Sequence, residues 1–589
     1  MQNSRSAVDR IKNSLSYKLG FTILEHVKYK GIKYVILPYK LYKIKKQYFK
    51  EQELYKQVIK IFPEFKYCKL ESCEDYNESL RYRCHLSYMF GEVLIKAHKT
   101  WYKGGYFKIF YSLKEKYRLY QNIQEIISIL PESLHYYFYN LIIKNYKINI
   151  QDLANIIIRH RNYMPILENI FHNFDFFIQY FEFVQSWLLS DEFEKIYKQE
   201  NHPYPPLFDP QKLNDKNEKV NYKNISAELA WKMNFPFPNK YKFCLLSFGL
   251  AGHVALDLYL RKCSCCLLYA NQTNLDKIYH FKHENLVLNV CSLWVRDFEF
   301  QKKVLYLLHK TPILILVRDP IERIKHGVNH GYYAKSKQKP YDEFNMGDDV
   351  NVVLDRFKYY YNSIPSDFPY FPESVDSILN KSTFLLNSFI DKNKNYIYYI
   401  DMKEILPDKS FETICQLSKK FKFNSPKQND LAFFREMKNN IFRYILPLTM
   451  NINYNKQNIK IYIENSHSRD SNVTDLFEYI YGKEHIFYGK VYFYLKKEDF
   501  KFLDIKDFIL YIKKYIDSFM YKLNLKISFI QKHRINESNI LDYFKTNKTM
   551  AIKLKKILDN ELTHIKQYSP NIIASWKYYQ DFERACKIL

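Results

Sequence analysis

Between Lys242 and Phe423, short apolar runs alternate with stretches of helical periodicity, and this alternation constrains the fold more than any other feature of the sequence. The runs that we interpret as strands are Phe243 to Ser247, Leu286 to Val290, Ile313 to Val317 and Tyr396 to Ile400. Helical spacing occurs near residues 252–261, 297–309, 320–330, 348–362 and 409–420. Strands that alternate with helices are joined by right-handed crossovers, which predicts a mostly parallel sheet. In such sheets a ligand binds beyond the carboxyl ends of the strands.

The regions on either side of this α/β part have other patterns. The N-terminal region contains a weak duplicated helix–turn motif, in which Leu-Ser-Tyr followed by Gly begins at Leu15 and again at Leu86. We expect five parts: this region over 1–114, helices over 115–200, a proline-rich linker over 201–242, the α/β domain over 243–425, and an α+β part followed by helices over 426–589. The predicted fold class is α/β, with mostly helical flanking regions.

The charge of the chain defines a class of partners without choosing one. Lys and Arg number 90 and Asp and Glu 63, which gives a net charge of +27. Such a chain is attracted to phosphate, to nucleic acid or to an anionic membrane surface. Drift towards AT-rich codons explains the abundance of Lys, Tyr and Phe as well as selection for binding a partner does. The aromatic segment Trp101–Tyr106 is interpreted as packing, with a carbohydrate or nucleic-acid contact as the alternative.

Cysteine usage and hydropathy favour a reduced, cytoplasmic protein. The ten cysteines include no pair of Cys-x-x-Cys motifs, and the cluster Cys263, Cys265 and Cys266 lacks the second half of a zinc site, so no metal is expected. The N-terminus is polar, and no uncharged apolar run of membrane-spanning length occurs. We therefore expect neither secretion nor a membrane span.

Glycine is scarce, with 12 residues, and five of them fall between Gly249 and Gly347. The sequence Ser247-Phe-Gly-Leu-Ala-Gly-His253 lies directly between a predicted strand and a predicted helix. In this position backbone N–H groups and the helix N-terminus can cradle a phosphate. No Gly-Lys-Ser/Thr follows, so the turn is not a Walker A loop. An ordinary strand–turn–helix connection is the alternative.

A second candidate element begins at Arg318, at the carboxyl end of a predicted strand. Asp319, Pro320 and Glu322 suit the N-cap, first and third positions of a helix, so helix initiation explains all three. Arg318 has no such explanation. Its guanidinium would face the same crevice as the glycine turn and would require either a ligand phosphate or a carboxylate partner.

These two elements resemble the nucleotide-binding elements of the sulfotransferase family, as does the strand, acidic turn and helix from Tyr396 to Phe421. The resemblance covers residues 243–423 and implies a P-loop-like, sulfotransferase-like domain with 3′-phosphoadenosine 5′-phosphosulfate as donor. It implies that Arg318 and His326 bind one phosphate and that the turn cradles the 5′ side. The turn residues concerned are Ser247, Gly249, Ala251, Gly252 and His253. The sequence departs from the family at Leu250, where many members carry Lys or Arg, and at His326, where Ser is usual.

A wider resemblance covers nearly the whole chain. The segments Lys99–Gly105, Ala230–Pro236, Glu561–Lys566 and Ser575–Tyr579 resemble a bacterial family of uncharacterised sugar transferases and capsular polysaccharide biosynthesis proteins. This resemblance implies a role in a surface-glycan pathway of the bacterial cell envelope.

A general base would come from the histidines near the predicted crevice. His253 follows the glycine turn, His283 precedes a strand, and Glu284 is the carboxylate alternative. His280, His326 and His330 belong to the same group. No Asp-x-Asp pair follows a strand, and Asp348-Asp349 is interpreted as a helix cap.

We therefore expect a cytoplasmic transferase that moves a group from a phosphorylated nucleotide to a glycan or lipid-linked glycan. Two roles are open for the rest of the chain: the flanking helical regions bind the acceptor or partner proteins, or the basic face brings the enzyme to the anionic inner membrane. A nucleotide-sugar glycosyltransferase is the alternative enzyme. A noncatalytic assembly protein or a nucleic-acid-binding protein is the alternative of another class, although no nucleic-acid-binding module is recognisable.

Overall fold

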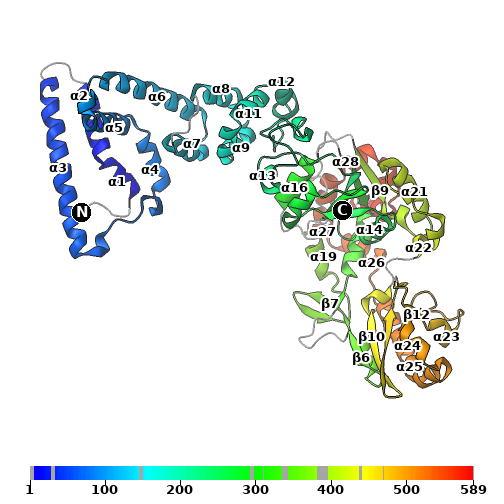
Figure 1. Ribbon diagram of the computed structural model, residues 1–589. Coiled ribbons are helices and arrows are strands. Elements are labelled where there is room, and N and C mark those ends of the chain that lie inside the picture. Colours follow the sequence, from blue (N-terminus) through cyan, green and yellow to red (C-terminus); the bar gives the residue numbers. More distant parts are fainter. Residues whose placement is uncertain are drawn as a thin grey trace. The chain divides into compact units, whose positions relative to one another are not determined.

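The computed structural model describes residues 6–27, 33–144, 150–291, 298–308, 311–333, 342–380, 396–436, 441–468 and 470–587. The chain forms two compact units, Met1–Pro236 and Phe237–Leu589 (Figure 1). None of the described helices combines the length and the apolar character that crossing a bilayer requires.

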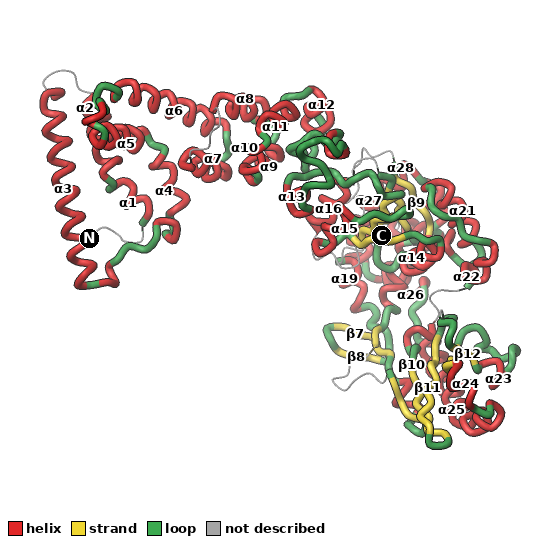
Figure 2. Tube along the Cα trace, viewed as in Figure 1, coloured by secondary structure: helices red, strands yellow, loops and turns green. Residues whose placement is uncertain are grey.

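The described residues of the N-terminal unit form helices and loops and contain no strand (Figure 2). Its α-helices are α1 (Ala7–Lys12), α2 (Leu15–Val27), α3 (Lys33–Ile61), α4 (Tyr76–Arg83), α5 (Leu86–Lys99), α6 (Ile109–Ile129), α7 (Glu132–Lys144), α8 (Ile150–His160), α9 (Met164–His172), α10 (Phe174–Gln179), α11 (Phe181–Leu188), α12 (Asp191–Phe193) and α13 (Ala227–Lys232).

The duplicated motif forms the contact between α2 and α5. A Cβ atom on Gly20 would lie 1.7 Å from the carbonyl oxygen of Ser87, and one on Gly91 would lie 1.7 Å from that of Ser16. Each copy therefore supplies one glycine that lets the other helix approach closely. Any side chain at either position would force the two backbones apart.

The proline-rich stretch is packed rather than extended, which corrects the expectation of a linker over 201–242. Asn169 donates to the carbonyl of Pro205 at 2.8 Å, and the Trp187 indole donates to that of Pro206 at 3.1 Å. Leu207 and Phe235 are fully buried. Apolar residues between the prolines hold this stretch against the helices, and the division between the units falls at Pro236.

The C-terminal unit contains the predicted parallel sheet, and all of its strand pairs are parallel. The strand order is β2-β3-β1-β4-β9. The bounds are β1 Phe243–Ser247, β2 Cys266–Tyr269, β3 Leu286–Cys291, β4 Ile313–Val317 and β9 Ile397–Asp401. Ser247 pairs with Cys291 on one side and with Leu316 on the other, so the carboxyl ends of the central strands lie level.

Helices cover this sheet and follow its strands in the chain. They are α14 (His253–Lys262), α15 (Leu275–His280), α16 (Phe298–Leu307), α17 (Pro320–Val328), α19 (Glu373–Leu379), α21 (Ser410–Phe421) and α22 (Leu431–Arg435). A second group follows later in the chain, with α26 (Glu537–Thr546), α27 (Lys548–Glu561), α28 (Thr563–Tyr568), α29 (Pro570–Ser575) and α30 (Lys577–Cys586).

The expected helix over 348–362 is only partly present. Asp349 caps α18 (Val350–Leu354) by accepting a hydrogen bond from the Asn351 N–H, as predicted for this acidic pair. The chain then enters β7 (Phe357–Tyr361), which pairs with β5 (Tyr332–Tyr333) and β8 (Ile364–Ser366). Aromatic residues favour a strand over the continuation of the helix.

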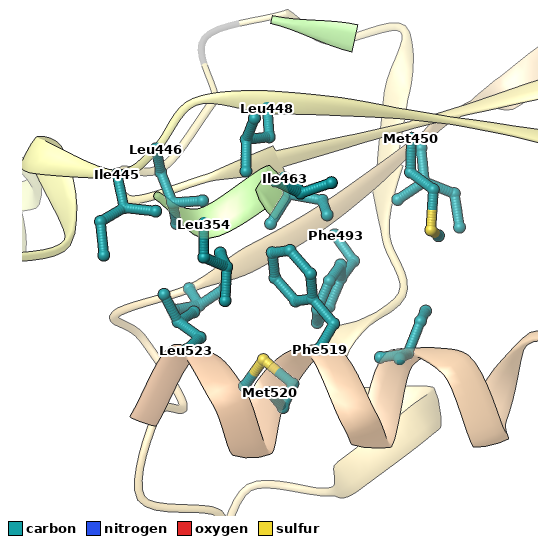
Figure 3. Packing of buried hydrophobic residues seen from close by; sticks show 14 of the residues in the cluster. Leu354, Ile445, Leu446, Leu448, Met450, Ile463, Phe493, Phe519, Met520 and Leu523 are labelled. Carbon is teal, nitrogen blue, oxygen red and sulfur yellow. The ribbon is translucent and has the colours of Figure 1, made fainter. Parts of the chain in front are cut away.

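A second, mixed sheet has the order β12-β13-β11-β10-β6 and packs on the long helix α25 (Ile505–Lys532). Its strands are β6 Glu343–Asn345, β10 Leu448–Tyr454, β11 Gln457–Glu464, β12 Val473–Asp475 and β13 Tyr492–Lys496, with α23 (Phe477–Tyr481) and α24 (Lys497–Phe502) beside them. Phe519 and Leu523 of α25 point towards Phe493 and Ile463 of the sheet (Figure 3).

Candidate functional site

The carboxyl ends of β1 and β4 form the switch point of the parallel sheet. The chain leaves β1 towards β2 on one side, and it leaves β4 towards β9 on the other. Connections that diverge from adjacent strands open a crevice between them, which is where ligands of such sheets bind. The glycine turn follows β1 and Arg318 follows β4, so both predicted elements lie at this edge.

The glycine turn has a tightly defined backbone. Gly252 has φ +98° and is the N-cap of α14, and a Cβ atom there would lie 3.1 Å from the Met402 side chain. Leu250 also has a positive φ, +69°, which is uncommon for a residue with a side chain. Leu250 thus occupies a left-handed position that costs about 1 to 2 kcal/mol for an L-residue.

Two arginines bind the carbonyl groups of this turn. Arg318 Nη1 donates to the carbonyl of Leu250 at 3.4 Å, and Arg323 Nη2 donates to that of Gly249 at 3.2 Å. Arg318 Nε also forms an ion pair of 3.0 Å with Glu322 Oε2. Of the two partners considered for Arg318, the structure therefore supplies the carboxylate. Burial, followed by the charge of Arg318, lowers the pKa of Arg323 to about 9.

Arg323 was not singled out from the sequence. It lies on α17 among the buried residues Ile321 and Ile324. The sequence does contain one signal for it, because a charged residue between apolar residues of a helix indicates a buried charge that requires a partner. The helix register alone could not show that its guanidinium reaches Gly249.

Burial favours the neutral form of two histidines at this edge, His253 and His326. Burial, and then Arg443, lowers the pKa of His253, which is the first residue of α14. Burial lowers the pKa of His326 to about 3, with Arg318 and His330 adding to the effect. A neutral imidazole can accept one hydrogen bond and donate another, so either ring can act as a base or as a hydrogen-bond donor.

The structure does not bring His283 and Glu284 to this site, which corrects their expected grouping with the glycine turn. Both side chains are exposed and come directly before β3, at the amino end of that strand. His283 Nδ1 accepts a hydrogen bond of 3.1 Å from the Asn285 N–H. In a parallel sheet the amino and carboxyl ends of the strands lie at opposite edges. The two residues are close to a strand in sequence, but they lie at the edge opposite the glycine turn.

Ser247 and Ala251 lie in the interior. Ser247 Oγ donates to Asn289 Oδ1 at 3.1 Å, and the Asn289 amide donates to Asp257 at 3.3 Å. The Tyr269 hydroxyl completes this network by donating to Asp257 Oδ2 at 2.6 Å. Ala251 belongs to the apolar core under the sheet. Both residues support the turn from below, while His253 is half-buried at its rim.

Two buried aspartates at the strand ends anchor a distant segment of the chain. Asp319 Oδ2 accepts hydrogen bonds from the N–H groups of Tyr578 and Tyr579, at 3.1 and 3.2 Å. Asp401 Oδ2 accepts one of 2.6 Å from the indole of Trp576. Burial raises the pKa of both carboxyl groups, that of Asp319 to about 6. The first turn of α30 is thereby fixed against the ends of β4 and β9.

A separate cavity of about 640 Å³ lies at the second sheet. Among the described residues, its lining combines aromatic and acidic side chains and includes no Lys or Arg: His467, Asp475, Glu478, Tyr479, Tyr488, Gly489 and Tyr492. Asp475 Oδ1 accepts hydrogen bonds of 3.0 Å from the N–H groups of Phe477 and Phe493, and burial raises its pKa. Sequence reasoning missed this cavity because its residues come from a loop, a strand end and a short helix.

Within the described ranges, no group of three or more His, Cys, Asp and Glu side chains could hold a metal ion. Burial raises the pKa of Cys263 and Cys265 to about 12, so both carry neutral thiols.

Fold and site together define a two-unit protein with a five-stranded parallel sheet and, at the switch point of that sheet, a glycine turn whose carbonyl groups accept hydrogen bonds from two arginines. Residues 399–589 match the family model described as "Protein of unknown function (DUF2972)", and residues 1–122 match that described as "Domain of unknown function (DUF8374)". Comparisons with curated proteins and with solved structures give no match. The first model spans both Asp401 and Trp576, so the contact that joins β9 to α30 lies within the matched region.

Proposed function

We propose that the C-terminal unit is a sulfotransferase-like transferase that binds a phosphorylated nucleotide at the β1–β4 edge and transfers a group to a sugar hydroxyl of a surface glycan. The observation that carries this proposal is the glycine turn between β1 and α14, which lies at the switch point of the parallel sheet and binds two guanidinium groups. A helix N-terminus beside positive charge favours a phosphate.

The residues at the edge have distinct roles in this proposal. The first turn of α14 directs its backbone N–H groups towards the 5′-phosphate side. Arg318, Arg323 and Glu322 carry a net charge of +1 and hold the turn in place. The neutral His326 ring donates to a second phosphate. Arg318 contributes mainly through its field and through the Leu250 carbonyl, because Glu322 already occupies its Nε.

His253 is the proposed general base, because it is neutral and half-buried at the rim of the turn. It would take the proton of the attacking sugar hydroxyl while the oxygen bonds to the transferred group. The bond from that group to the nucleotide phosphate breaks, and the nucleotide leaves with the bonding electrons. Proton transfer of this kind contributes about 10²- to 10⁴-fold to a rate.

The aromatic cavity is the proposed site for the glycan acceptor. A phosphate would find no cationic partner among its seven lining residues, although the chain as a whole is strongly basic. Tyrosine rings offer apolar faces to the C–H groups of a sugar, and the carboxylates of Asp475 and Glu478 accept hydrogen bonds from its hydroxyls. Its volume falls within the roughly 300 to 1,000 Å³ of small-ligand sites.

Thermal unfolding in the presence of candidate nucleotides tests the proposal. The panel holds 3′-phosphoadenosine 5′-phosphate, UDP, CMP and GDP, and a ligand at 100 times its Kd adds roughly 2.7 kcal/mol of stability. We expect stabilisation by the bisphosphate and its loss in Arg318→Ala. Glu322→Gln is the matched control, because it removes the ion pair and keeps the guanidinium.

Stabilisation by UDP, CMP or GDP instead would indicate a nucleotide-sugar glycosyltransferase. Loss of binding in Glu322→Gln to the same degree as in Arg318→Ala would make Arg318 structural. Stabilisation by none of the four nucleotides, with strongly salt-dependent binding of arbitrary oligonucleotides, would favour a nucleic-acid-binding protein.

A further inference from the structure

The turn between α5 and α6 exposes an unusual number of large aromatic side chains. Phe107 is 94% exposed, Phe110 82% and Trp101 66%. We call this group the aromatic tip; its members are Trp101, Tyr102, Tyr106, Phe107, Phe110 and Tyr111. Large apolar side chains gathered on one surface mark a site of interaction. This exposure also corrects the interpretation of Trp101–Tyr106 as packing.

The backbone of the aromatic tip has a defined conformation that local hydrogen bonds stabilise. Gly104 has φ +76° and ends the short 3₁₀ helix Trp101–Lys103. A Cβ atom on Gly105 would lie 2.4 Å from Thr100 Oγ1, so the chain reverses too tightly for any other residue. The N–H groups of Gly104 and Gly105 donate to the carbonyls of Trp101 and Thr100, at 3.1 and 3.0 Å. The backbone therefore holds the aromatic rings outward.

The segment that carries the aromatic tip has basic but no acidic side chains. Between Glu92 and Glu115 the sequence has five lysines and no acidic residue. Lys99, Lys103 and Lys108 are exposed beside the rings. Lys45 of α3 adds a further cation nearby, because its Nζ lies 2.7 Å from Nε2 of His98, whose Nδ1 lies 2.8 Å from the Tyr106 hydroxyl.

We propose that the aromatic tip docks the protein on an anionic lipid surface, with Phe107 and Phe110 entering the acyl boundary. Trp and Tyr rings suit the headgroup level, and lysines beside them pair with anionic lipids. A base-stacking platform requires rings that line a groove, whereas Phe107 projects almost free of protein neighbours. The contact is independent of the transfer chemistry, because it uses only residues of the N-terminal unit.

Co-sedimentation of the full-length chain with vesicles tests this docking. One vesicle preparation is phosphatidylcholine alone, and the other contains about one-third phosphatidylglycerol. We expect binding to the anionic vesicles only. Phe107→Ser with Phe110→Ser should lower the partition coefficient by about 100-fold, or about tenfold for each ring removed from the lipid. Lys99→Gln, Lys103→Gln and Lys108→Gln together should lower it to a similar degree, by about fivefold for each charge.

Matched controls come from exposed residues of α25 and α27. Leu510→Ser with Tyr521→Ser replaces side chains that are 71% and 64% exposed, and the triple change Lys506→Gln, Lys514→Gln and Lys556→Gln removes three exposed cations. Neither control should alter partitioning. The melting temperature should stay unchanged in the Phe107→Ser, Phe110→Ser variant, because these rings bury almost no surface.

Equal binding by wild type and by the Phe107→Ser, Phe110→Ser variant would overturn the proposal, as would the absence of binding to anionic vesicles. A wild-type dimer in light scattering that becomes monomeric in this variant, without any vesicle binding, would show that a second copy covers the aromatic tip. Tight binding of single-stranded DNA that is lost in the same variant, again without vesicle binding, would also refute it.

Discussion

Replacement of Trp576 by Phe should loosen α30 from the parallel sheet. The Trp576 side chain is 1% exposed, and its indole N–H donates to Asp401 Oδ2 at 2.6 Å. Phenylalanine keeps most of the apolar contact and removes the donor. Asp401 is only 6% exposed, so water cannot readily replace the lost hydrogen bond.

The magnitude follows from the charge of the acceptor. A hydrogen bond to a charged group contributes about 1.5 to 3 kcal/mol. The hydrogen bonds from Tyr578 and Tyr579 to Asp319 remain, so α30 should stay docked but open more often. A loss of this size accelerates amide exchange limited by local opening by about 10- to 150-fold.

Hydrogen exchange measured by mass spectrometry on the full chain provides the assay. Peptides from α29 and α30 should exchange faster in Trp576→Phe, and Asp401→Asn should produce a similar change. Trp101→Phe is the matched control, because this indole is 66% exposed and lies in the other unit. Two results would refute the conclusion that the contact between Trp576 and Asp401 holds α30 against the sheet. One is unchanged exchange of α30 in Trp576→Phe, and the other is faster exchange spread evenly over both units.

Four further outcomes are expected. His253→Gln should lower the initial rate of transfer by about 10²- to 10⁴-fold while nucleotide binding is kept, whereas His283→Gln at the opposite sheet edge should leave the rate unchanged; equal loss in both variants would contradict the site. Gly91→Ala should lower the free energy of unfolding of the N-terminal unit by about 2 kcal/mol or more in thermal denaturation, because its Cβ would meet the Ser16 carbonyl, while Glu92→Ala on the exposed face should have little effect. Burial raises the folded-state pKa of Asp319 from 3.8 to about 6, so the folded state binds this proton more tightly than the unfolded state. The resulting stabilisation is complete below pH 3.8 and is lost as the pH rises through about 6. In Asp319→Asn the urea midpoint should therefore depend less on pH between these values. Tyr492→Ala should abolish calorimetric binding of a neutral oligosaccharide, whereas Tyr568→Ala, at a ring that is 49% exposed, should not.

The sequence predicted the parts of the fold that depend on local periodicity. Four strands of the parallel sheet lie where alternation placed them, and Asp349 caps a helix as expected. Strand β2 was missed because its apolar run is short, four residues from Cys266 to Tyr269, and begins within the cysteine cluster. The helix over 348–362 ended early because the aromatic run after Asp355 favours a strand.

The site was harder to predict because its geometry is tertiary. The glycine turn and Arg318 lie at one edge because strand ends of a parallel sheet coincide, which a pattern of strands already implies. His283 and Glu284 are close in sequence to a strand, but at its amino end. The contacts of Arg323 with Gly249 and of Asp401 with Trp576 join residues 74 and 175 positions apart, and no local pattern encodes such pairs.

The hydrogen bond between Asp401 and Trp576 also determines when, during translation, this part of the fold can form. The sheet edge is translated 175 residues before the indole that binds it. At roughly 5 to 20 residues per second, the ribosome takes about 10 to 35 s to cover that distance. During this interval Asp319 and Asp401 keep their local donors, the N–H groups of Ile321 and Lys403, but lack the donors that residues 576–579 supply. The packing of α30 against the ends of β4 and β9 is therefore completed late, after most of the chain has left the ribosome.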